Sequence, residues 1–210
     1  KKARRMLDKA GLEDCKIMAS NSLDEYTITS LLIQGGPIDI FGVGERLITS
    51  KSDPVFGAVY KIASIEKDGM WEPRIKISES VEKITNPGLK KVYRVYNDKG
   101  RAIADLLTLL REVPDTEEPY RYIDPEQPWR ELYFENCTFK EMKQLVIKDG
   151  KLVVNLPTLE EIREYVQKQL SNEIWPEEQR FENPHRHYLD MSPSYYQLKM
   201  DLLNRIYRKK

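Results

Sequence analysis

Two glycines separated by a single residue, Gly42 and Gly44, are the residues whose type and spacing most directly suggest chemistry. They follow a short apolar run, and glycine has no Cβ to keep its backbone N–H from approaching an anion. Such a turn can bind a phosphate through backbone amides. It can equally be a tight strand-to-helix connection, because Gly-x-Gly alone is a weak signal. Both interpretations stay open at this point.

The residues beside these glycines could complete an anion site. Val43 and Glu45 would contribute backbone N–H groups, and we expect the Glu45 carboxylate to turn away from a phosphate because like charges repel. Arg46 could supply a positive charge through a charge-assisted pair. The alternative for Arg46 is a structural salt bridge to a neighbouring carboxylate.

Small polar residues follow the preceding apolar run, residues 15–20. Asn21 and Ser22 would lie beside the glycine turn if both runs are parallel strands of one sheet, because their carboxyl ends then meet at one edge. Short polar side chains suit ribose hydroxyls, and backbone amides suit phosphate. The two segments together predict a sugar-phosphate site.

The elements that would position this site alternate between helix and strand. Apolar spacing predicts a helix over residues 3–10, and Ser22-x-x-Glu25 resembles a capping box that starts a second helix. Gly35-Gly36-Pro37 must end that helix. We therefore interpret residues 1–54 as closing βα units of an α/β barrel. The sequence opens without Met and directly in a helical pattern, which suggests a fold entered midway.

The pattern changes after residue 54. Alternating apolar and polar segments with turns such as Lys67-Asp68-Gly69 predict an antiparallel β-rich region over residues 55–112, with strands at 59–62, 74–78 and 92–96. Prolines and acidic residues over 113–128 predict an exposed loop or linker. Residues 113–210 then form an α+β region. Its helices are expected to start at a Thr158 capping box and at Ser192-Pro193. The first of them is expected to bury an apolar stripe of Leu159, Ile162, Val166 and Leu170.

The histidines and cysteines offer weaker candidates. His185 and His187 could be a general base or metal ligands, but no acidic or cysteine cluster accompanies them, and a surface turn is the alternative that the sequence favours. We therefore predict no metal site. Cys15 is expected to pack inside the first strand, and Cys137 is expected to be structural.

Composition narrows the class of protein. Lys plus Arg and Asp plus Glu number 34 each, so no overall field attracts nucleic acid or anionic lipid, and we expect neither partner. No apolar run approaches the roughly 20 residues that a membrane crossing needs. Two distant cysteines fit a reducing cytoplasm.

The segment Phe-Gly-Val-Gly-Glu-Arg-Leu-Ile-Thr-Ser at residues 41–50 closely resembles bacterial nicotinate phosphoribosyltransferases. The likeness extends over nearly the whole chain and corresponds to the C-terminal portion of that family. Further matching segments are residues 20–26, 53–54, 57–61, 76–79, 87–94, 183–185 and 189–192.

The resemblance implies an incomplete TIM-like α/β barrel followed by a β-rich accessory domain and C-terminal helices. It implies a reaction of nicotinate, phosphoribosyl pyrophosphate, ATP and water that gives nicotinate mononucleotide, pyrophosphate, ADP and phosphate. Magnesium would accompany ATP, no prosthetic group is expected, and the enzyme would be a homodimer. The residues implied near the ribose are Asn21 and Ser22, and those implied at its 5′-phosphate are Gly42, Val43, Gly44 and Glu45.

The chain departs from the family pattern in two places. Asn21-Ser22 stands where many relatives have Gly-Asp, and Glu45 stands where others have Thr. The catalytic histidine, the nicotinate-binding arginine and an acidic Asp-Ser-Gly-Asp segment are expected upstream of Lys1, so no catalytic residue is assigned and the chain alone is expected to be inactive. A non-catalytic binding or scaffolding protein and a different sugar-phosphate barrel enzyme remain alternatives.

Overall fold

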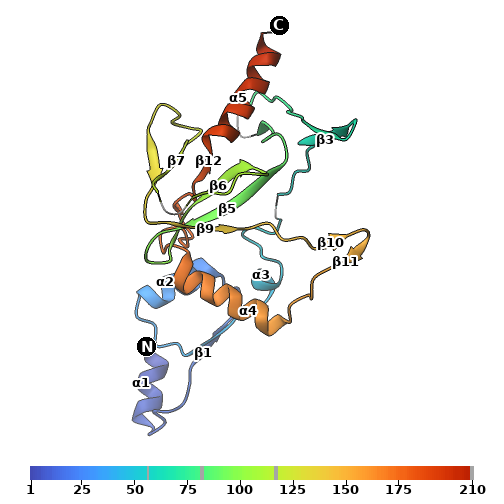
Figure 1. Cartoon of the computed structure of the whole chain (residues 1–210). Coiled ribbons are helices and arrows are strands. Elements are labelled where there is room, and N and C mark those ends of the chain that lie inside the picture. The colour runs from blue at the N-terminus through green and yellow to red at the C-terminus, as the bar shows by residue number, and fades with distance from the viewer. Residues whose placement is uncertain (56, 81–82, 116–117, 209–210) are drawn as a thin grey trace. The chain divides into compact units, whose positions relative to one another are not determined.

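The computed structural model describes residues 1–210 apart from residues 56, 81–82, 116–117 and 209–210. The chain forms two compact units, which meet in sequence between Tyr60 and Lys61 (Figure 1). Among the described helices, none has the length and hydropathy to cross a membrane.

The first unit alternates helix and strand, as the sequence predicts. The strands β1 and β2 pair in parallel with Ser20 opposite Gly42, and α2 connects them. Gly35 has a φ of 64°, a conformation that suits glycine and lets the chain leave α2. The elements in order are α1 (Lys2–Lys9), β1 (Met18–Ser20), α2 (Glu25–Ile33), β2 (Ile40–Gly42) and α3 (Glu45–Ile48).

Two local predictions in this unit are wrong. The N-cap of α2 is Asp24, whose side chain accepts a hydrogen bond from the Thr27 amide at 2.8 Å, so Ser22 starts no capping box. Asn21 and Ser22 have φ values of 84° and 50°, which are not helical, and α2 begins only after Asp24. Cys15 is exposed and precedes β1 instead of packing within it.

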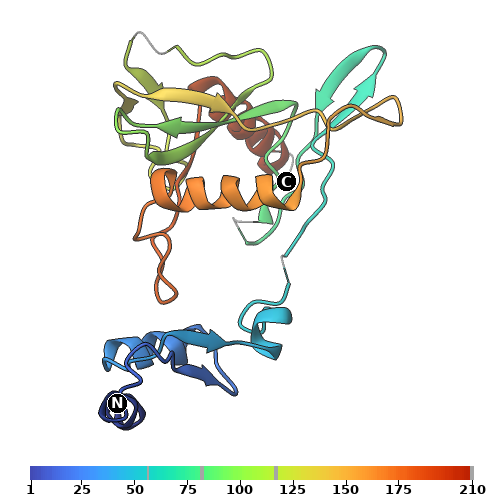
Figure 2. The same cartoon turned by 90° about the horizontal axis from the view of Figure 1, so that it is seen from below.

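The second unit is built on a four-stranded sheet with the order β12-β6-β5-β9 (Figure 2). β5 is antiparallel to β6 and β9, whereas β12 is parallel to β6. Val95 and Leu106 are fully buried in the core of this sheet. The strands are β5 (Lys90–Tyr96), β6 (Ala102–Leu109), β9 (Thr138–Glu141) and β12 (Leu189–Met191).

This sheet pairs strands from both sides of residue 112, where the sequence suggested a boundary. The expected linker over 113–128 also contains a strand, whose Tyr120 and Tyr122 pack against the core. Aromatic burial there outweighs the loop-forming effect of the neighbouring prolines. Residues 61–210 therefore form one compact unit, in place of two separate regions.

Among the described residues, the remaining strands form three hairpins, two of which, β3–β4 and β10–β11, stand out as extended ribbons in Figures 1 and 2. Asp68 and Gly69 form the predicted turn between β3 and β4 with positive φ values. Residues 59–62 and 74–78, predicted as strands, are irregular. The hairpins pair β3 (Ser64–Lys67) with β4 (Met70–Pro73), β7 (Tyr120–Tyr122) with β8 (Leu132–Phe134), and β10 (Ile147–Lys148) with β11 (Lys151–Leu152).

The helices of this unit begin where the sequence predicts. Thr158 forms the capping box of α4 (Leu159–Lys168), and a π-helical turn follows at Gln169–Glu173. Ser192 caps α5 (Pro193–Tyr207), with proline in its first turn. The apolar stripe of α4 was expected to be buried but is exposed within this chain: its residues are Leu159, Ile162, Val166 and Leu170.

Candidate functional site

The candidate site lies at the carboxyl edge of the β1–β2 pair in the first unit. Because Ser20 is opposite Gly42 in a parallel register, the segments that leave both strands start side by side. Asn21 and Ser22 leave β1 at this edge, and Val43 leaves β2 there. The structure thus brings together the two segments that the sequence proposed as one site.

The turn after β1 presents short polar groups. Asn21 and Ser22 both have positive φ values, which asparagine tolerates better than most residues. Ser22 Oγ lies 3.5 Å from Asn21 Oδ1, a long contact that leaves both groups able to bond elsewhere. Their role toward a ribose stays a prediction.

The two glycines differ in their surroundings. A Cβ on Gly42 would lie 2.8 Å from Met18 Cε and 3.1 Å from Ser20 Oγ, so this glycine permits close packing of β2 on β1. A Cβ on Gly44 would meet no atom within 4 Å. Gly44 is also the N-cap of α3, and no side chain caps the amides of that first turn. Gly42 therefore serves packing, whereas Gly44 borders open space.

Arg46 forms the structural salt bridge that was one of its two predicted roles. Its Nη1 lies 3.0 Å from Asp24 Oδ2 and connects the turn after β2 to the start of α2. Hydrogen bonds from Thr27 and, to a smaller extent, the charge of Arg46 lower the pKa of Asp24. The Glu45 carboxylate points to solvent, 4.0 Å from Lys51 Nζ, so only its backbone can serve the glycine turn.

A pocket of about 360 Å³ adjoins this turn on the side of α2 and α3. Asp24, Val43 and Arg46 line it, and Ser52 Oγ donates a hydrogen bond to Glu25 at its edge. Asp24 is the residue of this site that the sequence interpretation missed. An Asp-x-x-Thr spacing before an apolar helix was the available signal.

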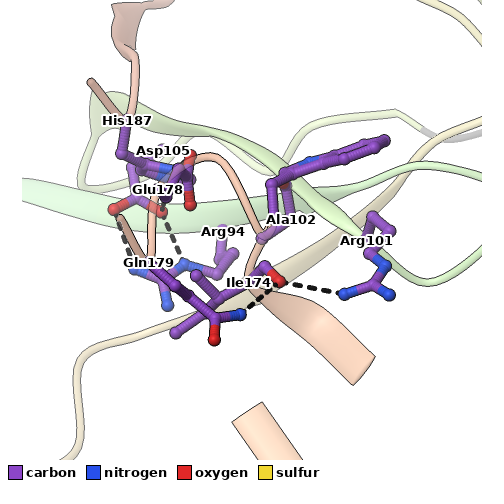
Figure 3. Close-up of polar contacts among 9 residues, drawn as sticks. Arg94, Arg101, Ala102, Asp105, Ile174, Glu178, Gln179 and His187 are labelled. Atoms are coloured by element: carbon purple, nitrogen blue, oxygen red, sulfur yellow. Dashed lines mark hydrogen bonds and ion pairs between the residues drawn. The ribbon is translucent and has the colours of Figure 1, made fainter. Parts of the chain in front are cut away.

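The two histidines occupy different environments in the second unit. His185 is exposed and stacks edge-on against Tyr188, as expected of a surface turn. His187 instead lies between Glu178, with Nδ1 3.0 Å from Oε1, and Asp105, with Nε2 3.5 Å from Oδ1 (Figure 3). Arg94 pairs with Asp105 in turn, at 2.9 Å. His187 thus belongs to a half-buried ion-pair network.

The charges of this network set its pKa values. Asp105 and Glu178 raise the pKa of His187. Burial alone would raise the pKa of Asp105, but His187 and Arg94 outweigh it and lower that pKa to about 2. Among the described residues, no group of three His, Cys, Asp or Glu side chains could hold a metal ion.

A model of the nicotinate phosphoribosyltransferase C-terminal domain matches residues 89–199, more than half of the chain. The chain belongs to the nicotinate phosphoribosyltransferase family. The match covers the sheet and the ion-pair network of the second unit, whereas the glycine turn lies outside it.

Relatives in this family resemble almost the whole chain. A nicotinate phosphoribosyltransferase of Bacillus subtilis (strain 168) is 38% identical over 207 residues, which are 98% of this chain and 42% of that protein. One from Caenorhabditis elegans is 36% identical over 88% of this chain and 32% of that protein. The chain therefore spans less than half the length of these nicotinate phosphoribosyltransferases.

A solved structure supports the fold. The crystal structure of human nicotinic acid phosphoribosyltransferase superposes with a TM-score of 0.69, covering 96% of this chain and 36% of that one. The sequence identity is 24%, so this likeness concerns the fold. It agrees with a mixed α/β chain that contains antiparallel sheets.

Proposed function

We propose that this chain is the C-terminal part of a nicotinate phosphoribosyltransferase and contributes the turn that binds the 5′-phosphate of phosphoribosyl pyrophosphate. Its similarity to the Bacillus subtilis enzyme along 98% of its length carries the proposal. The parallel pairing that places Asn21 beside Val43 supports the assignment of the turn.

In this proposal, different residues of the site contact the phosphate and the ribose. The open side of Gly44 admits a phosphate, and the uncapped amides of Gly44 and Glu45 would donate hydrogen bonds to its oxygens. Asn21 and Ser22 would bond ribose hydroxyls from the neighbouring strand end. Arg46, engaged with Asp24, would hold the turn in place and add positive charge nearby.

The proposed reaction is a glycosyl transfer. The bond between ribose C1 and the pyrophosphate oxygen breaks, the electron pair leaves with pyrophosphate, and the nicotinate nitrogen forms the new bond to C1. A protein accelerates such a step by positioning the two reactants and by stabilising developing charge. This chain would position the ribose by binding its 5′-phosphate, and other parts of the enzyme would bind the base.

ATP, with Mg²⁺ as its counterion, belongs to the proposal as a co-substrate. The described residues offer no cluster suited to a metal ion, so we assign magnesium no ligand in this chain. An incomplete TIM-like barrel that includes β1 and β2, a homodimer and a cytoplasmic location are further parts of the proposal. They rest on the family resemblance alone.

The proposal is tested on the complete enzyme that contains this chain. We expect turnover of nicotinate with phosphoribosyl pyrophosphate and Mg-ATP, and none of nicotinamide or quinolinate. Phosphoribosyl pyrophosphate should also slow hydrogen exchange of the amides at residues 42–46, with the exposed β10–β11 turn as an internal control. Turnover of another base would refute the substrate, and unchanged exchange at 42–46 would refute the assigned turn.

A further inference from the structure

A pocket of about 480 Å³ lies in the second unit, away from the glycine turn in sequence and outside the role proposed above. Pockets that hold small molecules are usually of about this volume and combine aromatic walls with a few polar groups. Tyr122 and Phe134 stack at 3.8 Å between ring centroids in its wall. The other lining residues that matter here are Asp124, Gln127, Arg130, Tyr188 and Asp190.

Asp190 is the unusual group in this pocket. Only 5% of the residue is exposed, and within the described part of the chain no side chain or amide donates a hydrogen bond to its carboxylate. Asp190 lines this pocket and a second, smaller one beside it. Because the carboxylate is largely buried and faces a pocket, a hydrogen-bond donor bound there would offset the cost of its burial.

A second carboxylate lies next to Asp190. Ile123 and Met191 exchange two backbone hydrogen bonds, at 2.8 and 3.0 Å, which places their neighbours Asp124 and Asp190 side by side. Burial, together with the charge of Asp124, raises the pKa of Asp190 to about 7, although His187 opposes this shift. Two neighbouring carboxylates attract a cation more strongly than either does alone.

Two cations near the pocket are engaged with other groups, whereas Arg130 in its lining forms no ion pair with the described residues. Arg186 pairs with Glu126 at 2.5 Å, and Lys199 donates to Asn86 at 2.8 Å. Arg130 lines the pocket and contacts Gln127 at 3.5 Å, and no ion pair between Arg130 and Asp190 occurs in the described structure. Among the described residues no donor is bonded to the Asp190 carboxylate, so its place is open to a molecule that enters the pocket.

The chemistry of the lining selects the class of molecule. Mg²⁺ and Ca²⁺ take about six or more oxygen ligands, and among the described residues no three His, Cys, Asp or Glu side chains come together to hold a metal ion. An ammonium or guanidinium group supplies both positive charge and N–H donors, and aromatic faces attract such cations. We propose that this pocket binds a small organic cation, an amine or a guanidine, through Asp190 and Asp124.

The test uses the whole 210-residue chain with ¹³C-labelled aspartate and methylguanidinium chloride as the probe. We expect a saturable shift of the Asp190 carboxyl signal. N-methylurea, which has a similar shape without the charge, should cause none, and NaCl at equal ionic strength should not reproduce the shift. A response that follows chloride concentration alone, or an equal response to N-methylurea, would overturn the proposal.

Variants make the assignment specific, with calorimetry measuring the affinity for methylguanidinium. Asp190→Asn should lower it at least about tenfold, the usual effect of losing a charge-assisted hydrogen bond. Asp149→Asn, a change at an exposed turn, should leave it unchanged. Asp124→Asn keeps an acceptor for the Glu126 amide and should weaken binding severalfold, which provides a second test if Asp190→Asn folds poorly. Equal affinity in all three variants would overturn the proposal.

Discussion

At the scale of single residues, Arg46 combines an ion pair in the structure with a proposed role near the phosphate. Its ion pair with Asp24 is partly exposed, with 39% of the Arg46 side chain and 13% of the Asp24 side chain accessible. Exposed pairs of this kind contribute at most about 1 kcal/mol to stability. The pair nevertheless connects the glycine turn, which follows β2, to the start of α2.

We predict that Arg46 acts mainly by holding the turn in place. In the complete enzyme, Arg46→Met and Asp24→Asn should then raise the KM for phosphoribosyl pyrophosphate by similar factors, and the double variant should add little to either. The asparagine side chain can still accept the hydrogen bond from the Thr27 amide, so α2 should begin at the same residue. A KM increase in Arg46→Met alone would show instead that Arg46 contacts the phosphate directly.

At the scale of elements, the N-caps of α4 and α5 look alike in sequence but differ in what depends on them. Ser192 is fully buried; its Oγ accepts from the Tyr195 amide at 3.1 Å and donates to Glu112 Oε2 at 2.7 Å. Glu112 also accepts from the Leu109 amide at 2.6 Å. Ser192 therefore connects α5 to the end of β6, whereas Thr158 caps a helix without buried residues.

This difference predicts unequal costs for the same type of substitution. Ser192→Ala should lower the free energy of unfolding by about 2 kcal/mol, because the half-buried Glu112 carboxylate and the Tyr195 amide both lose a partner. Thr158→Ala should cost about 0.5 to 1 kcal/mol, since water can replace its contacts. Urea unfolding measured by circular dichroism gives both values. Equal losses would mean that the Ser192 network contributes no more than an ordinary cap.

Elements whose signals are local could be predicted from the sequence. The Thr158 and Ser192 caps and the Asp68-Gly69 turn depend on residues within four positions of one another, and the structure contains all three. The strand β6 was not predicted because alanine and leucine favour helix, and its pairing with β5 and β12 decides its conformation. Periodicity identified the apolar face of α4 but could not show whether this chain covers it.

In the candidate site too, some features could be predicted from local sequence and others depend on contacts between distant residues. The two strand ends, with Asn21 and Gly44, followed from the alternation of helix and strand. The partner of Arg46 lies 22 positions earlier, at Asp24, and only the parallel register brings the two together. Asp190 was part of a matched segment, yet its unpartnered burial depends on the bridge between Ile123 and Met191, for which the sequence carries no local signal.

At the scale of the whole molecule, the two units differ in how much core they contain. Leu23 is the one buried hydrophobic residue within the described part of residues 1–60. The second unit buries two clusters around its sheet, one centred on Val95 and Leu106 and the other on Met191 and Tyr195. Because burial of apolar surface is the main source of stability, the second unit should hold most of the stability of this chain.

We therefore predict that residues 61–210, produced alone, unfold cooperatively, whereas residues 1–60 do not. The free energy of unfolding and the urea dependence of residues 61–210 should match those of the main transition of the whole chain, since that dependence follows the surface exposed. Urea titrations followed by circular dichroism and by amide NMR spectra measure both. A cooperative transition in residues 1–60 would show that this unit folds stably although Leu23 is its one buried hydrophobic residue in the described structure. An unfolded 61–210 fragment would show that the sheet needs the βα units to be stable.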